Sequence, residues 1–142
     1  MNPKLAAAIR LAELGYRIFP CHPGSKAPLT THGFHDASTS VDQIERWWSI
    51  HPDANIGLHT VGMLVVDVDG ADNRWPHHPG RSLDLAACPM AVTPRGGCHY
   101  LFRQPAGAAL NNTTSRLSEH VDTRADGGYI VVAPSSVDDR SY

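Results

Sequence analysis

The stretch MLVVDVDG at residues 63–70 constrains the fold most strongly, because it has the pattern of a buried β-strand that ends in two carboxylates. Alternate residues of a strand point to the same face, so Asp67 and Asp69 are predicted to project together. Burying a carboxylate is costly unless a cation or hydrogen-bond donors compensate its charge. The pattern therefore predicts either a positive group beside the strand end or a strand that ends at the solvent-exposed surface.

The two aspartates are chemically suited to a divalent metal ion. Neighbouring carboxylates repel each other unless a cation lies between them. Oxygen ligands on a rigid strand suit Mg²⁺ or Mn²⁺, which keep water ligands and share the phosphates of a substrate. A bare Asp-x-Asp pattern is more often a strand end in water, so other residues have to support the metal interpretation.

Two further segments carry groups that suit phosphate or metal binding. VTPRGGCHYLF places Arg95, Gly96-Gly97 and His99 in one short turn and strand. Glycines let backbone N–H groups approach an anion, and Arg and His donate charge-assisted hydrogen bonds, although the pattern also fits a hairpin with an incidental histidine. VDTRADGG places Asp122 and Arg124 two apart on an expected strand, either beside a metal or as a surface ion pair worth little.

The rest of the chain predicts an α+β fold with one domain over residues 1–142. Apolar spacing indicates a helix around residues 5–12 that ends near Gly15, and Ser40 with Gln43 is a capping-box pattern that begins a second helix. A short helix is expected over residues 82–87 and a turn at Gly127-Gly128. Strands are predicted at residues 16–20, 55–60, 62–69, 91–93, 99–102, 121–124 and 129–133, the second and third joined by a tight turn.

Composition narrows the classes of function. The formal net charge is -2, with 12 basic and 14 acidic residues, so any contact with nucleic acid must come from a local patch. Cys21, Cys88 and Cys98 form no Cys-x-x-Cys pair, which favours a reducing compartment over a disulfide framework. No stretch approaches the roughly 20 apolar residues that span a bilayer. We therefore expect a cytoplasmic protein that does not contact a membrane.

Six segments, taken in order, are similar to one known family. They run from about residue 5 to residue 136: GYRIFPCHPGSKAP, HGFHDAST, IERWWSIHPDANIGLHT, VVDVDG, TPRGGCHYLF and VDTRADGGYIVVAPSS. Together they resemble the bifunctional DNA primase/polymerase N-terminal (prim-pol) domain of the archaeo-eukaryotic primase superfamily, common in phages, plasmids and integrated elements. The resemblance implies a mixed sheet with packed helices, in the RRM-like catalytic fold of these primases.

The resemblance also implies a catalytic set of three acids and a histidine. Asp67 and Asp69 match the family's Asp-x-Asp motif, and Asp122 matches its motif of an apolar residue followed by Asp. In such enzymes these three acids are the metal ligands. His99 matches the motif of a small residue, any residue and His, and the resemblance implies that it contacts the triphosphate of the incoming nucleotide.

Nucleotide-binding residues follow from the same comparison. Arg95 before Gly96 and Gly97, and Arg124 after the third acid, match phosphate-contacting arginines of the family. Lys26 matches the lysine of the family's Lys-x-Pro loop, for which the nucleotide-facing role is less well defined. The family pattern APPS stands here as Ala-Pro-Ser-Ser at residues 133–136, so one proline is missing.

The function that the resemblance implies is template-directed nucleotidyl transfer, as a DNA primase, a DNA polymerase or both. Two Mg²⁺ or Mn²⁺ ions would be the cofactors, and no zinc is expected, because His77, His78 and Cys88 lack metal-ligand spacing. The implied partners are a single-stranded DNA template, a primer, nucleoside triphosphates and a helicase domain or subunit. Such domains usually close a little beyond the position of Tyr142, which suggests truncation at the C-terminus, but the residues do not tell whether the chain is a fragment of a larger primase-helicase.

Two alternatives stay open at this point. VVDVDG also resembles the first motif of haloacid-dehalogenase-type phosphohydrolases, in which the first Asp is the nucleophile, although Gly70 is followed here by Ala71 and not by Thr or Ser. The other alternative is a non-catalytic remnant of a replication protein that binds nucleotide or nucleic acid. The preference for ribo- or deoxynucleotides, the template start site and the oligomeric state do not follow from the residues.

Overall fold

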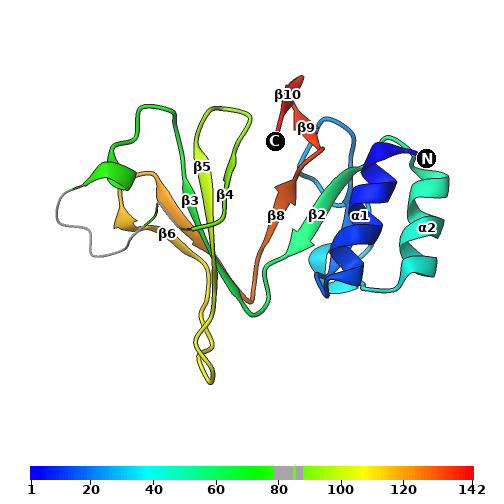
Figure 1. Cartoon of the computed structure of the whole chain (residues 1–142), viewed down its shortest axis with the longest axis horizontal. Coiled ribbons are helices and arrows are strands. Elements are labelled where there is room, and N and C mark those ends of the chain that lie inside the picture. The colour runs from blue at the N-terminus through cyan, green and yellow to red at the C-terminus, as the bar shows by residue number, and fades with distance from the viewer. Residues whose placement is uncertain (79–84, 86–87) are drawn as a thin grey trace. The chain divides into compact units, whose positions relative to one another are not determined.

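The fold was obtained as a computed structural model, which describes residues 1–78, 85 and 88–142 (Figure 1). These residues form two compact units: residues 1–59 with 129–142, and residues 60–128. The predicted α+β class is confirmed by two α-helices and several short strands. Where a mixed sheet was expected, every strand pair in the described part is antiparallel. The short helix expected over residues 82–87 lies, except for residue 85, outside the described residues.

The first unit combines a three-stranded sheet with two helices. The sheet has the order β1-β2-β8, formed by β1 (Ile18–Cys21), β2 (Asn55–His59) and β8 (Tyr129–Val132). Helices α1 (Pro3–Glu13) and α2 (Val41–Ile50) pack against each other, as Figure 1 shows in blue and cyan. The unit also contains the 3₁₀ helix η1 (Gly33–Asp36) and a hairpin of β9 (Ser136–Val137) and β10 (Arg140–Ser141).

Both helices begin where capping chemistry predicts. The Asn2 side chain accepts a hydrogen bond from the backbone N–H of Lys4 at 2.8 Å, and the helix stops just before Gly15, whose φ is +95°. The Ser40 hydroxyl accepts from the Gln43 N–H at 3.4 Å at the start of α2. None of the helices in the described part of the chain has the length and apolarity needed to cross a membrane.

The core of the first unit gathers residues from strands and loops. Phe19, Cys21, Ala37 and Val131 form a buried cluster, and the partly buried Trp47 packs against it. The neighbouring Trp48 is also a core residue, because it is 2% exposed and donates its indole N–H to the Ala54 carbonyl at 3.3 Å. Both tryptophans therefore pack in the core. Their helical spacing favours this role over stacking on the bases of a nucleic acid.

The second unit is built on a five-stranded antiparallel sheet with the order β4-β5-β3-β7-β6. Its strands are β3 (Met63–Val68), β4 (Met90–Val92), β5 (Cys98–Arg103), β6 (Thr113–Ser118) and β7 (Val121–Arg124), with the 3₁₀ helix η2 (Trp75–His77) after β3. Val66, Val68, Tyr100 and Val121 belong to one buried cluster. Because side chains alternate along a strand, the other face of the central strand β3 carries Asp67.

The predicted tight turn between the strands at 55–60 and 62–69 is confirmed, since the Met63 N–H donates to the Thr60 carbonyl at 3.1 Å. The sequence did not show which strands pair: β2 pairs with β1 and β8, whereas β3 pairs with β5 and β7. Strand β6 lies in a stretch that the sequence marks only as a polar connection. Its residues, TTSRLS, lack the alternation of apolar and polar side chains that marks a strand, and it pairs with β7 across an irregular register.

Candidate functional site

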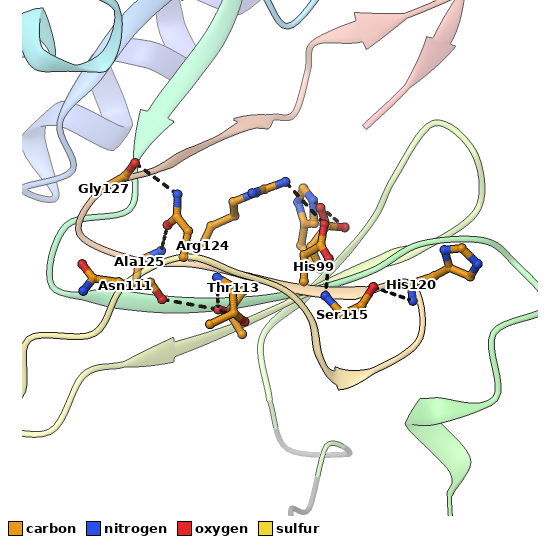
Figure 2. A network of polar contacts seen from close by, with 12 residues as sticks. His99, Asn111, Thr113, Ser115, His120, Arg124, Ala125 and Gly127 are labelled. Carbon is orange, nitrogen blue, oxygen red and sulfur yellow. Dashed lines mark hydrogen bonds and ion pairs between the residues drawn. The ribbon is translucent and has the colours of Figure 1, made fainter.

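Strand register places three of the predicted site residues side by side. Asp67 of the central strand β3 pairs directly with His99 of β5 on one side and with Asp122 of β7 on the other. Directly paired residues of an antiparallel ladder project from the same face. Nε2 of His99 lies 3.4 Å from Oδ1 of Asp67, and Figure 2 shows His99 and Arg124 within one network of polar contacts.

Asp122 is held on both of its carboxylate oxygens. Oδ1 accepts a hydrogen bond from the backbone N–H of Ser115 at 2.9 Å, and Oδ2 lies 3.6 Å from Nη2 of Arg124. Arg124 follows two residues later on β7, so its side chain projects from the same face. The ion pair is about one-third exposed and adds little stability by itself. Its effect is to keep a positive charge next to the acids.

His99 is buried, with only 6% of its surface exposed. Its ring lies on the same face of the sheet as Asp67, the residue directly opposite it in the ladder. The contact with Asp67 restrains the orientation of the ring, since a charged or polar partner is needed for a buried imidazole. The side chain therefore contributes both to packing and to the polar face of the sheet.

Asp69 lies immediately after the end of β3 and has an exposed side chain. Its backbone N–H donates to the carbonyl of His120 at 2.9 Å, and its own carbonyl accepts from the Asn73 side chain at 3.3 Å. The backbone of Asp69 is thus fixed from both sides. Because Asp69 lies beyond the end of β3, the predicted facing of its carboxylate toward the side of Asp67 stays a prediction.

The donor chemistry of these acids fits Mg²⁺ or Mn²⁺, which prefer carboxylate oxygens. Asp67 and Asp122 are directly paired, and like charges at such positions destabilise a sheet unless a cation or donors compensate them. Across residues 1–78, 85 and 88–142, no three His, Cys, Asp or Glu side chains are already gathered as a metal-binding group. The fit therefore rests on the paired carboxylates, with Asp69 at the adjoining strand end.

The turn between β4 and β5 lies against the same strand end. A Cβ atom on Gly97 would stand 2.2 Å from the Val68 carbonyl oxygen, and one on Gly96 would stand 2.9 Å from the Ala71 side chain. The Gly96 N–H is already donated to the Thr93 carbonyl at 2.8 Å, so it serves the turn itself. Arg95 is exposed at the tip, and the close contacts of the two glycines keep this tip beside the chain that carries Asp69.

The profile of the family described as "Bifunctional DNA primase/polymerase, N-terminal" matches residues 8–142, nearly the whole chain. The chain belongs to this family. A comparison with curated proteins gave no match. Membership in the prim-pol family confirms the resemblance seen in the sequence and implies activity of the DNA primase/polymerase type. It also decides against the phosphohydrolase alternative.

One predicted site residue of the prim-pol domain lies in the other unit. Lys26 follows β1 in the first unit, with an exposed side chain, and its carbonyl accepts a hydrogen bond from the Tyr129 hydroxyl at 2.9 Å. The acids, His99 and both arginines all lie in the second unit. The nucleotide-binding role of Lys26 stays a prediction.

Three residues around the prim-pol acids were missed from the sequence: Ser115, His120 and Asn73. Each holds an acid or its backbone through a hydrogen bond that involves a backbone group. Ser, Asn and exposed His are common in loops, so these residue types do not by themselves indicate a contact with the acids. Only the irregular pairing of β6 with β7, which no sequence pattern marks, brings Ser115 to Asp122.

Proposed function

We propose that this prim-pol domain catalyses template-directed nucleotidyl transfer, joining nucleoside triphosphates to a primer or start nucleotide on single-stranded DNA. The observation that supports this proposal is the direct register of Asp67 with both His99 and Asp122. Nucleotidyl transfer needs metal-binding carboxylates and a hydrogen-bond donor for phosphate close together. Two acids and a histidine on adjacent strands meet this requirement. Replication of a phage, plasmid or integrated element is the proposed setting, with a helicase domain or subunit as a partner.

Asp67, Asp69 and Asp122 are the proposed ligands of two Mg²⁺ or Mn²⁺ ions. When bound, such a pair supplies Lewis acidity for the attacking 3′-hydroxyl and offsets charge on the departing pyrophosphate. The protein would contribute fixed carboxylates: that of Asp122 is restrained by Ser115 and Arg124, and that of Asp67 faces His99.

The remaining residues are proposed to bind and orient the triphosphate. His99 would donate a hydrogen bond to a phosphate oxygen from a buried position, where such bonds are stronger than in water. Arg124 and the exposed Arg95 would add positive charge along the same phosphates. Of the two turn glycines, Gly97 is the better candidate for backbone contact with an anion, because the Gly96 N–H is used within the turn.

A primer-extension assay tests the proposal. Wild-type protein, a labelled primer on a single-stranded template, deoxynucleoside triphosphates and Mn²⁺ should give longer strands, and EDTA should stop the reaction. Asp67→Ala should give no extension while still binding some triphosphate through His99 and the arginines. Binding without any extension by the wild type would support the non-catalytic alternative, and would overturn this proposal.

A further inference from the structure

The irregular part of β6 has a backbone that its residue types do not favour. Between the registered pairs Thr113–Thr123 and Ser118–Val121, β6 advances five residues while β7 advances two. Within this bulge Ser115 has φ +51°, and His120 in the following turn has φ +57°. Residues other than glycine adopt such angles only at a cost, so other contacts must hold them there.

Burial does not explain the strained conformation. Ser115 and His120 are exposed, and Leu117 between them is 51% exposed. The imidazole of His120 lies 3.4 Å from the exposed carboxylate of Glu119, so the ring is engaged at the surface. The groups that the bulge holds in place are therefore backbone N–H and C=O groups and the Ser115 hydroxyl.

These groups form one continuous chain of hydrogen bonds between two of the acids. The Ser115 N–H donates to Asp122 Oδ1 at 2.9 Å, and the Ser115 hydroxyl accepts from the His120 N–H at 3.2 Å. The His120 carbonyl in turn accepts from the Asp69 N–H at 2.9 Å. Figure 2 shows Ser115 and His120 joined in this way beside Arg124 and His99.

We infer that the segment from Ser115 to His120 is a positioning element that orients the carboxylate of Asp122 and the backbone of Asp69 for metal binding. The inference rests on the proposed function, because the strained backbone at Ser115 and His120 can orient metal ligands only if these acids bind metal. With the Ser115 N–H on Oδ1, the other carboxylate oxygen of Asp122, Oδ2, is the one that lies near Arg124. The decisive property of Ser115 is then its positive φ, which aims the N–H.

Two substitutions separate this property from a general structural role. Asn tolerates positive φ, whereas the β-branched Val does so poorly, and both remove the hydroxyl. Ser115→Val is expected to raise the dissociation constant for Mn²⁺ roughly tenfold, and Ser115→Asn to change it much less. The measurement is calorimetric titration of the nucleotide-free protein with Mn²⁺, with folding checked by thermal unfolding in EDTA.

The triphosphate provides the readout that distinguishes positioning from damage. Affinity for triphosphate in EDTA should be equal in Ser115→Val, Ser115→Asn and the wild type, because His99 and the arginines are untouched. If Ser115→Val is unfolded, the pair His120→Val and His120→Asn repeats the comparison at the second strained residue, with the same expected order.

The outcomes keep the two proposals apart. Equal Mn²⁺ affinity in the Val and Asn variants, alongside loss of binding in Asp67→Ala, would overturn the positioning role and leave the metal site standing. Wild-type protein that binds no Mn²⁺, or Asp67→Ala that binds it as well as wild type, would remove the metal site and this inference with it. Weaker Mn²⁺ binding in the Val variants alone supports the positioning role.

Discussion

Asp67 lies directly opposite Asp122 across the β3–β7 ladder, so two carboxylates of like charge share one face of the sheet. Such pairs are unfavourable by about 0.2–1 kcal/mol in an ordinary sheet. His99 contacts one carboxylate, and Ser115 with Arg124 contacts the other, so the protein compensates part of the repulsion by itself. A cation bound at the pair would compensate the rest.

Asp122→Asn should therefore have opposite effects with and without metal. In EDTA the variant should be as stable as the wild type or slightly more stable, because the amide removes the repulsion and keeps an acceptor for Ser115. In Mn²⁺ the wild type should gain stability through binding to the native state, and the variant should lose most of that gain. Thermal unfolding at several Mn²⁺ concentrations measures both effects. A variant with the full Mn²⁺-dependent gain would show that Asp122 is not a ligand.

Substitution of His99 should weaken nucleotide binding. A hydrogen bond to a charged group is worth about 1.5–3 kcal/mol, so His99→Ala should lower triphosphate affinity roughly ten- to a hundredfold. Because His99 is 6% exposed, the alanine variant also leaves a cavity and should be less stable. His99→Gln keeps most of the volume and a donor, so it should be more stable and retain more affinity.

The exposed His77 in the same unit provides the matched control for His99. His77→Ala should bind triphosphate as the wild type does. A folded His99→Ala protein that extends primers and binds nucleotide at wild-type levels would show that the imidazole does not contact the triphosphate.

The elements that sequence patterns predicted are those with strong local signals. Helix α2 begins where Ser40 and Gln43 place it, and β3 follows the apolar run before Asp69. Asp67, His99 and Asp122 were recognised as candidates from residue types and a family resemblance. Their direct pairing was not predictable, because alternation along each strand gives its faces but neither its partners nor its register.

The parts that sequence patterns missed depend on contacts between distant residues. The turn after β2 has the same local pattern as a hairpin turn, yet Thr60 at this turn is buried and donates its hydroxyl to the Ala125 carbonyl at 2.7 Å. Asn55 is also fully buried, and its amide donates to the carbonyls of Ser25 and Ser136 at 2.9 and 2.6 Å. Asn55 and Thr60, which belong to the family-like motifs, therefore serve folding. Residue type alone does not distinguish such a role from a catalytic one.

The three cysteines should differ in reactivity. Burial raises the pKa of the Cys21 thiol from 9.0 to about 12, whereas Cys88 and Cys98 are only partly buried. Iodoacetamide at mildly alkaline pH should therefore label Cys88 and Cys98 in the native protein and Cys21 only after unfolding, because the thiolate is the reactive form. Peptide mass spectrometry gives the order of labelling. Early labelling of Cys21 would contradict its place in the core.

The same pKa shift predicts a loss of stability at high pH. The folded state holds the Cys21 proton more tightly than the unfolded state, so the contribution is complete below pH 9.0 and declines as the pH rises toward about 12. Urea unfolding of wild type and Cys21→Ala across this range measures it. The wild type should lose more stability with rising pH than the variant, and parallel curves would contradict the shift.

Gly97→Ala should disturb both stability and nucleotide binding. The added Cβ would lie 2.2 Å from the Val68 carbonyl oxygen, which belongs to the backbone of the central strand and has little freedom to move. Crowding of this kind typically costs about 1–3 kcal/mol of folding free energy. Relief of the clash requires β5 to shift at its first residues, next to His99, so triphosphate affinity in Mn²⁺ should fall roughly tenfold or more.

Gly127→Ala is the matched control, because a Cβ atom there would meet no atom within 4 Å. Chemical denaturation and nucleotide titration on both variants separate crowding from the general effect of replacing a glycine. Gly127→Ala should match the wild type in both measurements. If Gly97→Ala lost stability but kept full triphosphate affinity, the start of β5 would not position His99. Gly97 would then serve packing alone.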